Sequence, residues 1–166
     1  MKYKKIITRS LLVLLVVFIL IQFFRPAKNI DLSSHFSHEI STKYPLPDSI
    51  QTILEKSCYD CHSNNTVYPW YASIQPAAWW LNSHIKEGKR EINFSEFTSY
   101  PIRRQYKKLK DLIDQVKEDE MPLSSYTLIH RYAILSKPQQ DALINWASGL
   151  RDSIKANYPP DSLVKK

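Results

Sequence analysis

The stretch CYDCH at residues 58–62 constrains this chain more than any other feature of its sequence. It contains the only two cysteines, Cys58 and Cys61, and His62 follows directly. A disulfide between the two cysteines would close a very short loop and add little stability. A structural zinc site normally needs four ligands, commonly from two such pairs, and the chain has no second pair.

The surroundings of CYDCH narrow the remaining interpretations. A thioredoxin-like redox pair follows a strand in a βαβ unit, and no stretch here alternates as a strand does. Cys-x-x-Cys-His is instead the signature of c-type haem attachment, in which the two thiols hold the haem and an imidazole binds its iron. We therefore expect Cys58 and Cys61 to hold one covalent haem c per chain, with His62 as the proximal iron ligand.

Composition and spacing favour an all-α fold. The chain has 166 residues with 2 Gly and 10 Pro, which disfavours a β-rich protein with many tight turns. A Ser136–Gln139 capping box marks the start of the last helix. Apolar spacing predicts four main helices, over about 48–60, 76–88, 101–118 and 136–150. We expect a haem-binding domain over 48–155, a polar linker over 26–47 and a disordered tail over 156–166.

The first thirty residues combine a basic head with an apolar run, LLVLLVVFILIQFF, over 11–24. Fourteen residues rise about 21 Å as a helix, short of a ~30 Å hydrocarbon core. Adding Ile6 and Ile7 and letting Arg9 snorkel brings the helix close to spanning length. Because no A-x-A-like cleavage site follows, residues 1–25 are predicted to be an uncleaved signal anchor, with a cleaved signal peptide as the alternative. This predicts a single-pass inner-membrane protein with its domain in the periplasm.

The excess of positive charge lies mainly in the first thirty residues. The formal net charge is +7, and six basic residues precede residue 30, where there are no acids. From residue 30 onward seventeen bases face sixteen acids. Since phosphate binding requires clustered cations, we expect no nucleic-acid partner.

The sixth iron position has one main candidate. Apart from Met1, the chain contains a single methionine, Met121, between two expected helices. A loop position lets its thioether approach the iron opposite His62, and a His/Met pair is typical of electron-transfer cytochromes. The alternatives are that Met121 fills a core gap, that His130 or His84 is the ligand, or that the position is open.

Large aromatic side chains follow the motif. A haem presents wide apolar faces, and Trp and Tyr can also donate hydrogen bonds to its carboxylates. Trp70, Trp79 and Trp80 are near CYDCH in sequence and are expected to pack on the haem. Ordinary core packing is an equal alternative for each of them.

Three stretches together suggest a family. They are CYDCHSNNTVYPWYASIQPAAWWLNSHIKEGKREINFSEF, EMPLSSYTLIHRYAILS and INWA. Over about residues 30–150 the chain closely resembles the membrane-anchored haem-binding domain proteins common in Bacteroidetes-type bacteria. The resemblance implies a monohaem, cytochrome-c-like helical domain, and Met121-Pro122 is similar to the distal-ligand segment of small soluble cytochromes c.

The expected function is that of a membrane-anchored periplasmic electron carrier with an unidentified redox partner protein. No constellation of residues for hydrolysis or group transfer is visible, so electron transfer is favoured over enzymatic turnover. The alternatives are a haem-based sensor of small ligands, with Met121 displaced or absent from the iron, and a small haem peroxidase, which needs an open iron face.

Overall fold

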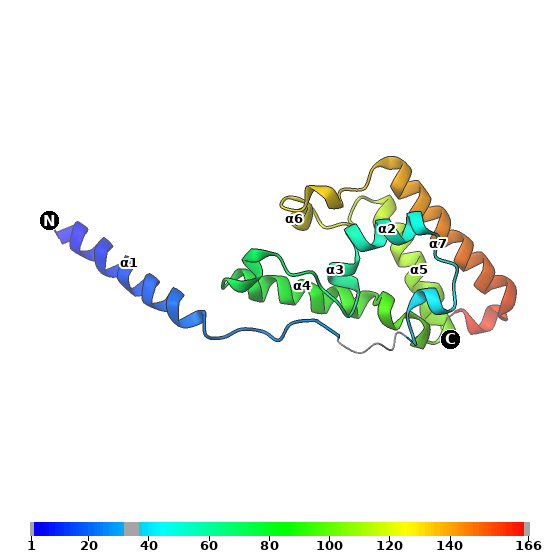
Figure 1. The fold of residues 1–166 in the computed structure, drawn as a ribbon, viewed down its shortest axis with the longest axis horizontal. Helices are drawn as coiled ribbons and strands as arrows, with labels where there is room; N and C mark the ends of the chain where they lie inside the picture. The colour runs from blue at the N-terminus through cyan, green and yellow to red at the C-terminus, as the bar shows by residue number, and fades with distance from the viewer. Residues whose placement is uncertain (1, 32–36, 165–166) are drawn as a thin grey trace.

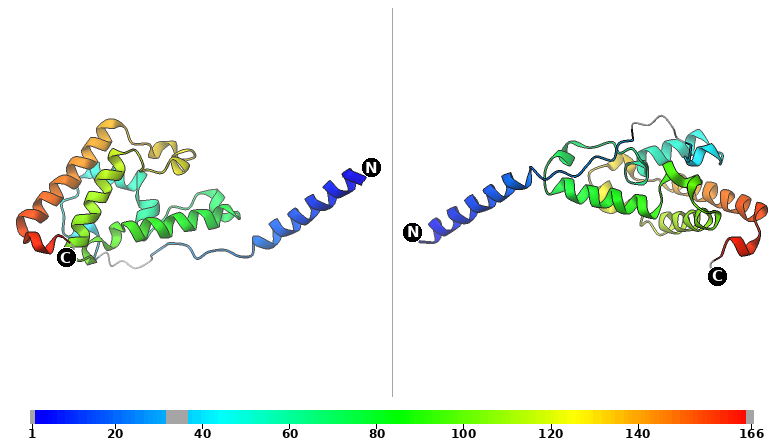
Figure 2. Two further views of the ribbon diagram at one scale, coloured as in Figure 1. Left: turned by 180° about the vertical axis from the view of Figure 1, so that it is seen from behind. Right: turned by 90° about the horizontal axis from the view of Figure 1, so that it is seen from below.

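The computed structural model describes residues 2–31 and 37–164, and the regular elements in that part are all helical. They contain no β-strand, and one isolated bridge joins Ile30 to Asn65. The prediction of an all-α protein is therefore confirmed. Figures 1 and 2 show helix α1 projecting away from the other helices, which form the main body.

The described residues form seven α-helices: α1 Lys2–Ile21, α2 Asp48–Ser57, α3 Tyr59–His62, α4 Ala77–Glu91, α5 Ile102–Lys117, α6 Ser124–Thr127 and α7 Lys137–Asn157. Short 3₁₀ turns cover Ile40–Thr42, Trp70–Ser73, Phe94–Ser99, Arg131–Ala133 and Pro160–Ser162. The helices predicted over 101–118 and from Ser136 onward correspond to α5 and α7. The expected capping box of Ser136 and Gln139 is present at the start of α7.

The core lies where α2, α5 and α7 meet. Helices α5 and α7 pack along each other, as Figure 1 shows, and α2 crosses α7. Leu54 of α2, Leu109 of α5 and Leu143 of α7 are fully buried there. Each sits on the apolar stripe of its helix, so burial of these stripes supplies most of the helices' stability. Helix α3, which carries Cys61 and His62, packs against α4 beside this core.

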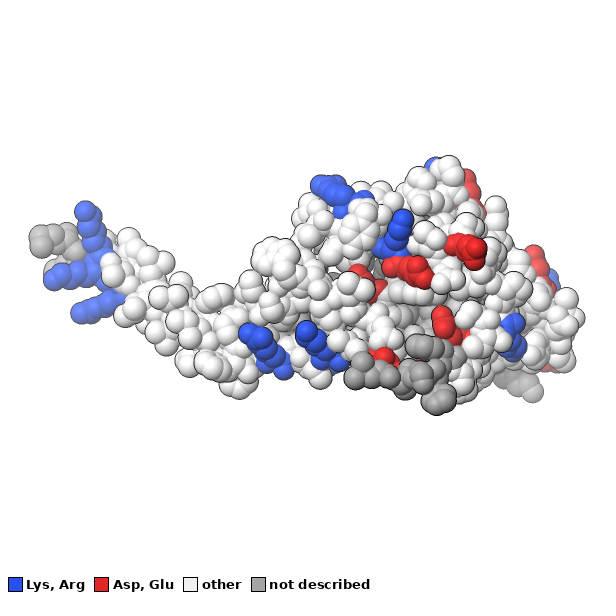
Figure 3. All heavy atoms as spheres, in the orientation of Figure 1, with Lys and Arg blue, Asp and Glu red and all other residues white. Residues whose placement is uncertain are grey.

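Helix α1 corrects the prediction of a membrane-spanning segment. Its basic residues Lys2, Lys4, Lys5 and Arg9 lie in its first eight positions, so every stretch of eighteen residues in it carries at least three of them. Figure 3 shows basic side chains gathered at this end of the molecule. Throughout 2–31 and 37–164, no helix is both long enough and apolar enough to cross a bilayer. The predicted transmembrane helix and single-pass inner-membrane location are therefore wrong. A helix extended to spanning length would also contain the basic residues that precede the apolar run.

The expected linker over 26–47 contributes to the core. Ile40 is fully buried, and Tyr44 is 7% exposed. The Tyr44 hydroxyl donates a hydrogen bond of 2.5 Å to Oε1 of Gln105 in α5. Residues 32–36 of this linker lie outside the described residues. The second half of the segment is thus packed structure, which its polar composition concealed.

The expected disordered tail over 156–166 also differs from the structure. Helix α7 continues seven residues past its expected end at 150, and a 3₁₀ turn follows it. Leu163 is 8% exposed and belongs to the core cluster. Residues 165–166 lie outside the described part of the chain. Leu163 and the partly buried Tyr158 therefore dock this segment on the core.

Candidate functional site

The CYDCH motif forms a break between two helices. Helix α2 ends at Ser57, and the Cys58 amide still donates to the Leu54 carbonyl at 2.9 Å. The Cys58 backbone then turns, and its carbonyl accepts the His62 amide at 2.9 Å to start the single turn α3. The helix predicted over 48–60 is thus two helices. This arrangement puts both thiols and the imidazole on one short turn beside α4.

Close contact between α3 and α4 depends on Gly88. A Cβ at this position would lie 2.7 Å from the Cys61 carbonyl oxygen, closer than packed atoms allow. The sequence suggested that a helix ends near Gly88, but α4 continues to Glu91. The glycine is therefore required by the approach of Cys61 rather than by a helix end. A glycine within an apolar helical pattern was the sequence signal for this contact.

His62 is held in one defined orientation. Its Nδ1 lies 2.9 Å from the carbonyl oxygen of Gly88 and 3.0 Å from that of Ile92, at the end of α4. Carbonyls only accept hydrogen bonds, so Nδ1 carries the proton and Nε2 keeps a free lone pair. Burial lowers the pKa of His62, which favours the neutral ring, while the two carbonyls oppose that shift. Metal-binding histidines typically have such a carbonyl partner on the second nitrogen.

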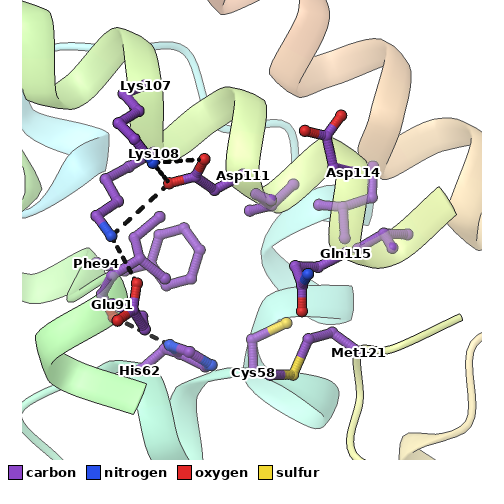
Figure 4. A pocket seen from close by; sticks show the side chains of 14 residues that line it. Cys58, His62, Glu91, Phe94, Lys107, Lys108, Asp111, Asp114, Gln115 and Met121 are labelled. Carbon is purple, nitrogen blue, oxygen red and sulfur yellow. Dashed lines mark hydrogen bonds and ion pairs between the residues drawn. The ribbon is translucent and has the colours of Figure 1, made fainter. Parts of the chain in front are cut away.

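Two cavities meet at this histidine. The larger, of about 410 Å³, lies between α5 and the end of α4, and the smaller, of about 280 Å³, lies between α4 and α6. Four residues line both of them: Cys58, His62, Glu91 and Met121. In Figure 4 the sulfur atoms of Cys58 and Met121 lie close together, with the His62 ring beside them. Together the cavities have the size of a cofactor site.

Four of the charged side chains of the larger cavity gather at one end, while Asp114 lies apart from them. Lys108 Nζ lies 2.8 Å from Glu91 Oε2 and 3.8 Å from Asp111 Oδ2, and Lys107 Nζ lies 2.7 Å from Asp111 Oδ2. Figure 4 shows this cluster at the opposite end of the view from Met121. The apolar wall between the two ends includes Phe94. The larger cavity therefore has an ionic cluster at one end, and the Gln115 amide lies near the two sulfur atoms at the other.

Met121 is presented by the turn that ends α5. The amides of Glu120 and Met121 both donate to the Gln115 carbonyl, at 2.9 and 3.2 Å. Asp119 has φ 57°, a left-handed conformation that closes the helix, and its Oδ1 accepts a hydrogen bond from Gln140 of α7 at 2.6 Å. These contacts fix the direction in which the chain leaves α5. The structure thus brings Met121 to the same cavities as His62.

The two cysteine thiols are free and protonated at neutral pH. Both are partly buried, and neither forms a disulfide. Burial raises the pKa of Cys58 to about 12, with the nearby Cys61 adding to the effect. Burial also raises the pKa of Cys61 to about 11, with Asp60 contributing. Redox-active cysteine pairs show the opposite shift, so this environment disfavours a thioredoxin-like role.

The two rival histidines occupy different surroundings. His130 is 8% exposed, with Nε2 2.8 Å from the Tyr71 hydroxyl and Nδ1 3.0 Å from the Tyr132 hydroxyl. Both of its nitrogens are therefore engaged. His84 lines the smaller cavity, and its Nδ1 lies 2.9 Å from the Trp80 carbonyl oxygen.

None of the three tryptophans expected to pack on a haem lines either cavity, but the Trp80 ring centroid lies 4.3 Å from that of His84, which lines the smaller one. Trp70 is 78% exposed, Trp79 is 40% exposed and Trp80 is 43% exposed. Trp79 Nε1 donates to the Phe24 carbonyl at 2.8 Å. The packing of these tryptophans on a haem therefore stays a prediction.

Comparison with known proteins identifies the family. The chain belongs to the haem-binding domain family, which it matches over residues 16–149. It is therefore a haem-binding protein, and the prediction that it binds haem is confirmed. No curated protein and no solved structure matches this chain. The residues at the meeting point of the cavities fit a haem, since His62 offers a free Nε2 within a largely apolar enclosure.

Proposed function

We propose that this protein is a c-type monohaem electron carrier. In this proposal Cys58 and Cys61 would hold one haem covalently, and His62 and Met121 would be the ligands of its iron. The observation that carries the proposal is the orientation of His62, whose Nδ1 proton is held by two carbonyls and whose Nε2 has no hydrogen-bond partner within residues 2–31 and 37–164. Met121 lines the same two cavities as His62, which supports it as the second ligand.

A bound haem supplies a one-electron iron couple. The protein's own residues would orient it and keep water from it. The carbonyls of Gly88 and Ile92 hold the His62 ring and raise its basicity toward the iron. Phe94, Val116 and Leu143 provide the apolar lining of the larger cavity. A thioether ligand and an apolar surrounding both favour the reduced iron and raise the potential.

The proposal assigns no catalytic residue. A peroxidase requires an open iron face, and a sensor requires Met121 to be displaced or absent from the iron. Met121 at the junction of the cavities favours electron transfer over both alternatives. The redox partner is proposed to be another protein.

Replacing Met121 tests the ligand set. The change Met121→Ala should lower the reduction potential by on the order of 100 mV, within the ~0.8 V range that axial ligands span. It should also let the ferrous protein take up CO immediately after mixing. The matched control is Leu123→Ala, which removes another apolar side chain from the smaller cavity but no sulfur. Equal potentials for Met121→Ala and wild type would remove Met121 from the ligand set, and immediate CO uptake by wild type would favour a sensor or peroxidase.

A further inference from the structure

One hydrogen bond joins the two walls of the smaller cavity. The Tyr126 hydroxyl donates to Oδ2 of Asp60 at 2.7 Å. Asp60 lies between the two cysteines, and Tyr126 lies five residues after Met121. Both residues line this cavity. The bond therefore connects the cysteine segment directly to the segment that follows the proposed distal ligand.

Both partners are fixed by their other contacts. Oδ1 of Asp60 accepts the Val67 amide at 3.0 Å, and the Asp60 carbonyl accepts the Thr66 hydroxyl at 2.6 Å. The Tyr126 ring stacks on His130, with ring centroids 4.3 Å apart and planes 16° apart. His130 is itself buried between two other tyrosine hydroxyls. These contacts orient the carboxylate and the phenol ring toward each other.

The segment between Met121 and His130 has few other attachments to the body. All of its residues are described, and none from 121 to 129 is buried. Leu128 and Ile129 are 66% and 57% exposed. Helix α6 makes its main contacts with the turn Arg131–Ala133, which directly follows the segment. A stretch with so little burial opens easily unless a specific contact holds it.

From these observations we infer that Tyr126 and Asp60 form a clasp that keeps Met121 in place at the iron. Tyr126 is a positioning residue, because it acts through the Met121 segment rather than on the haem. The inference rests on the proposed function for the identity of the ligand. It adds a residue pair that controls the access of small molecules to the iron. A chain with the clasp broken would populate an open form in which Met121 has left the cavity.

The test uses Tyr126→Phe in the full-length, haem-loaded protein. This change keeps the ring that stacks on His130 and removes only the hydroxyl that reaches Asp60. The matched control is Tyr68→Phe, which removes a hydroxyl that accepts the Asn29 amide at 2.6 Å, away from both cavities. Two rates are measured: amide hydrogen exchange at Leu128 and His130, and CO uptake by the ferrous protein.

A hydrogen bond to a carboxylate is strong enough that its loss should speed both rates by about 10- to 100-fold. The Tyr68→Phe control should change neither rate. Unchanged exchange at Leu128 and His130 in Tyr126→Phe would show that the bond does not hold the segment. Faster exchange with unchanged CO uptake would show that the segment moves without Met121, and it would equally overturn the inference. A colourless protein would instead overturn the proposed function, and with it any role of the clasp at the iron, whatever the exchange rates.

Discussion

The two glycines of this chain provide a matched test of the α3–α4 contact. Both lie inside helices, where replacing Gly by Ala stabilises a helix by about 0.5–1 kcal/mol. A Cβ at Gly149 meets no atom within 4 Å, so Gly149→Ala should gain that stability in full. A Cβ at Gly88 would lie 2.7 Å from the Cys61 carbonyl oxygen, which belongs to the backbone and cannot rotate away. Forcing α3 and α4 apart should cost about 1–3 kcal/mol.

The helix gain is common to both variants, so the difference between them measures the contact. Their free energies of unfolding should differ by about 1–3 kcal/mol, with Gly149→Ala the more stable. Thermal unfolding followed by circular dichroism suffices, since 1 kcal/mol shifts Tm by roughly 2–4 °C for a chain of this size. Gly88→Ala should also reduce the fraction of protein that carries haem, because His62 loses its carbonyl partners. Equal increases in Tm for the two variants would refute the close approach of Cys61 to α4.

Two further predictions concern contacts outside the cysteine motif. The side chain of Lys108 holds the pKa of Glu91 below its usual 4.5, so the pair stabilises the fold above pH 4.5 and loses that effect as pH falls through the lowered pKa. Lys108→Met should therefore lower the free energy of unfolding by about 0.2–1 kcal/mol at pH 7, measured by urea titration, and by progressively less below pH 4.5. The control Lys56→Met removes a cation that has no ion pair among the described residues, and its effect should not depend on pH in this way. Gln75 is fully buried, and its Nε2 donates to the Phe24 carbonyl at 2.8 Å, so Gln75→Ala should cost about 1–3 kcal/mol by thermal unfolding. The control Gln51→Ala, at an exposed glutamine, should lower the free energy of unfolding by less than 0.5 kcal/mol, roughly the value of a surface contact. Equal losses for the two variants would show that the buried hydrogen bond of Gln75 does not stabilise the fold.

Helices with a regular apolar stripe could be predicted from the sequence. Leu109 and Val116 in α5 lie at helical spacing and are buried as that spacing requires. The start of α7 followed from the local chemistry of Ser136 and Gln139. The placement of CYDCH at the end of a helix followed from the apolar stripe of α2. These features depend on residues close to one another in the chain.

Features that depend on contacts between distant segments could not be predicted in this way. The need for Gly88 arises from Cys61, and the bond between Tyr126 and Asp60 joins residues 66 positions apart. Burial of Tyr44 in the expected linker depends on α5. Nothing in the local sequence around these residues encodes their partners.

The prediction of a membrane span at the N-terminus failed because of where the basic residues lie. Its apolar run was correctly read as helix, and α1 includes it through Ile21. The prediction of a membrane span depended on extending the apolar run to Ile6 and Ile7, with the Arg9 side chain reaching the membrane surface. They lie among lysines and Arg9, so extending the helix brings in charges as well as apolar residues.

The most direct measurement of the central claim is a pyridine haemochrome spectrum of the full-length protein, recorded after extraction with acidified organic solvent. The protein is produced in a host that matures c-type cytochromes. The polypeptide should keep one haem through the extraction and show the spectrum of a haem with two thioether links. A colourless polypeptide in which an alkylating reagent modifies both Cys58 and Cys61 would contradict it.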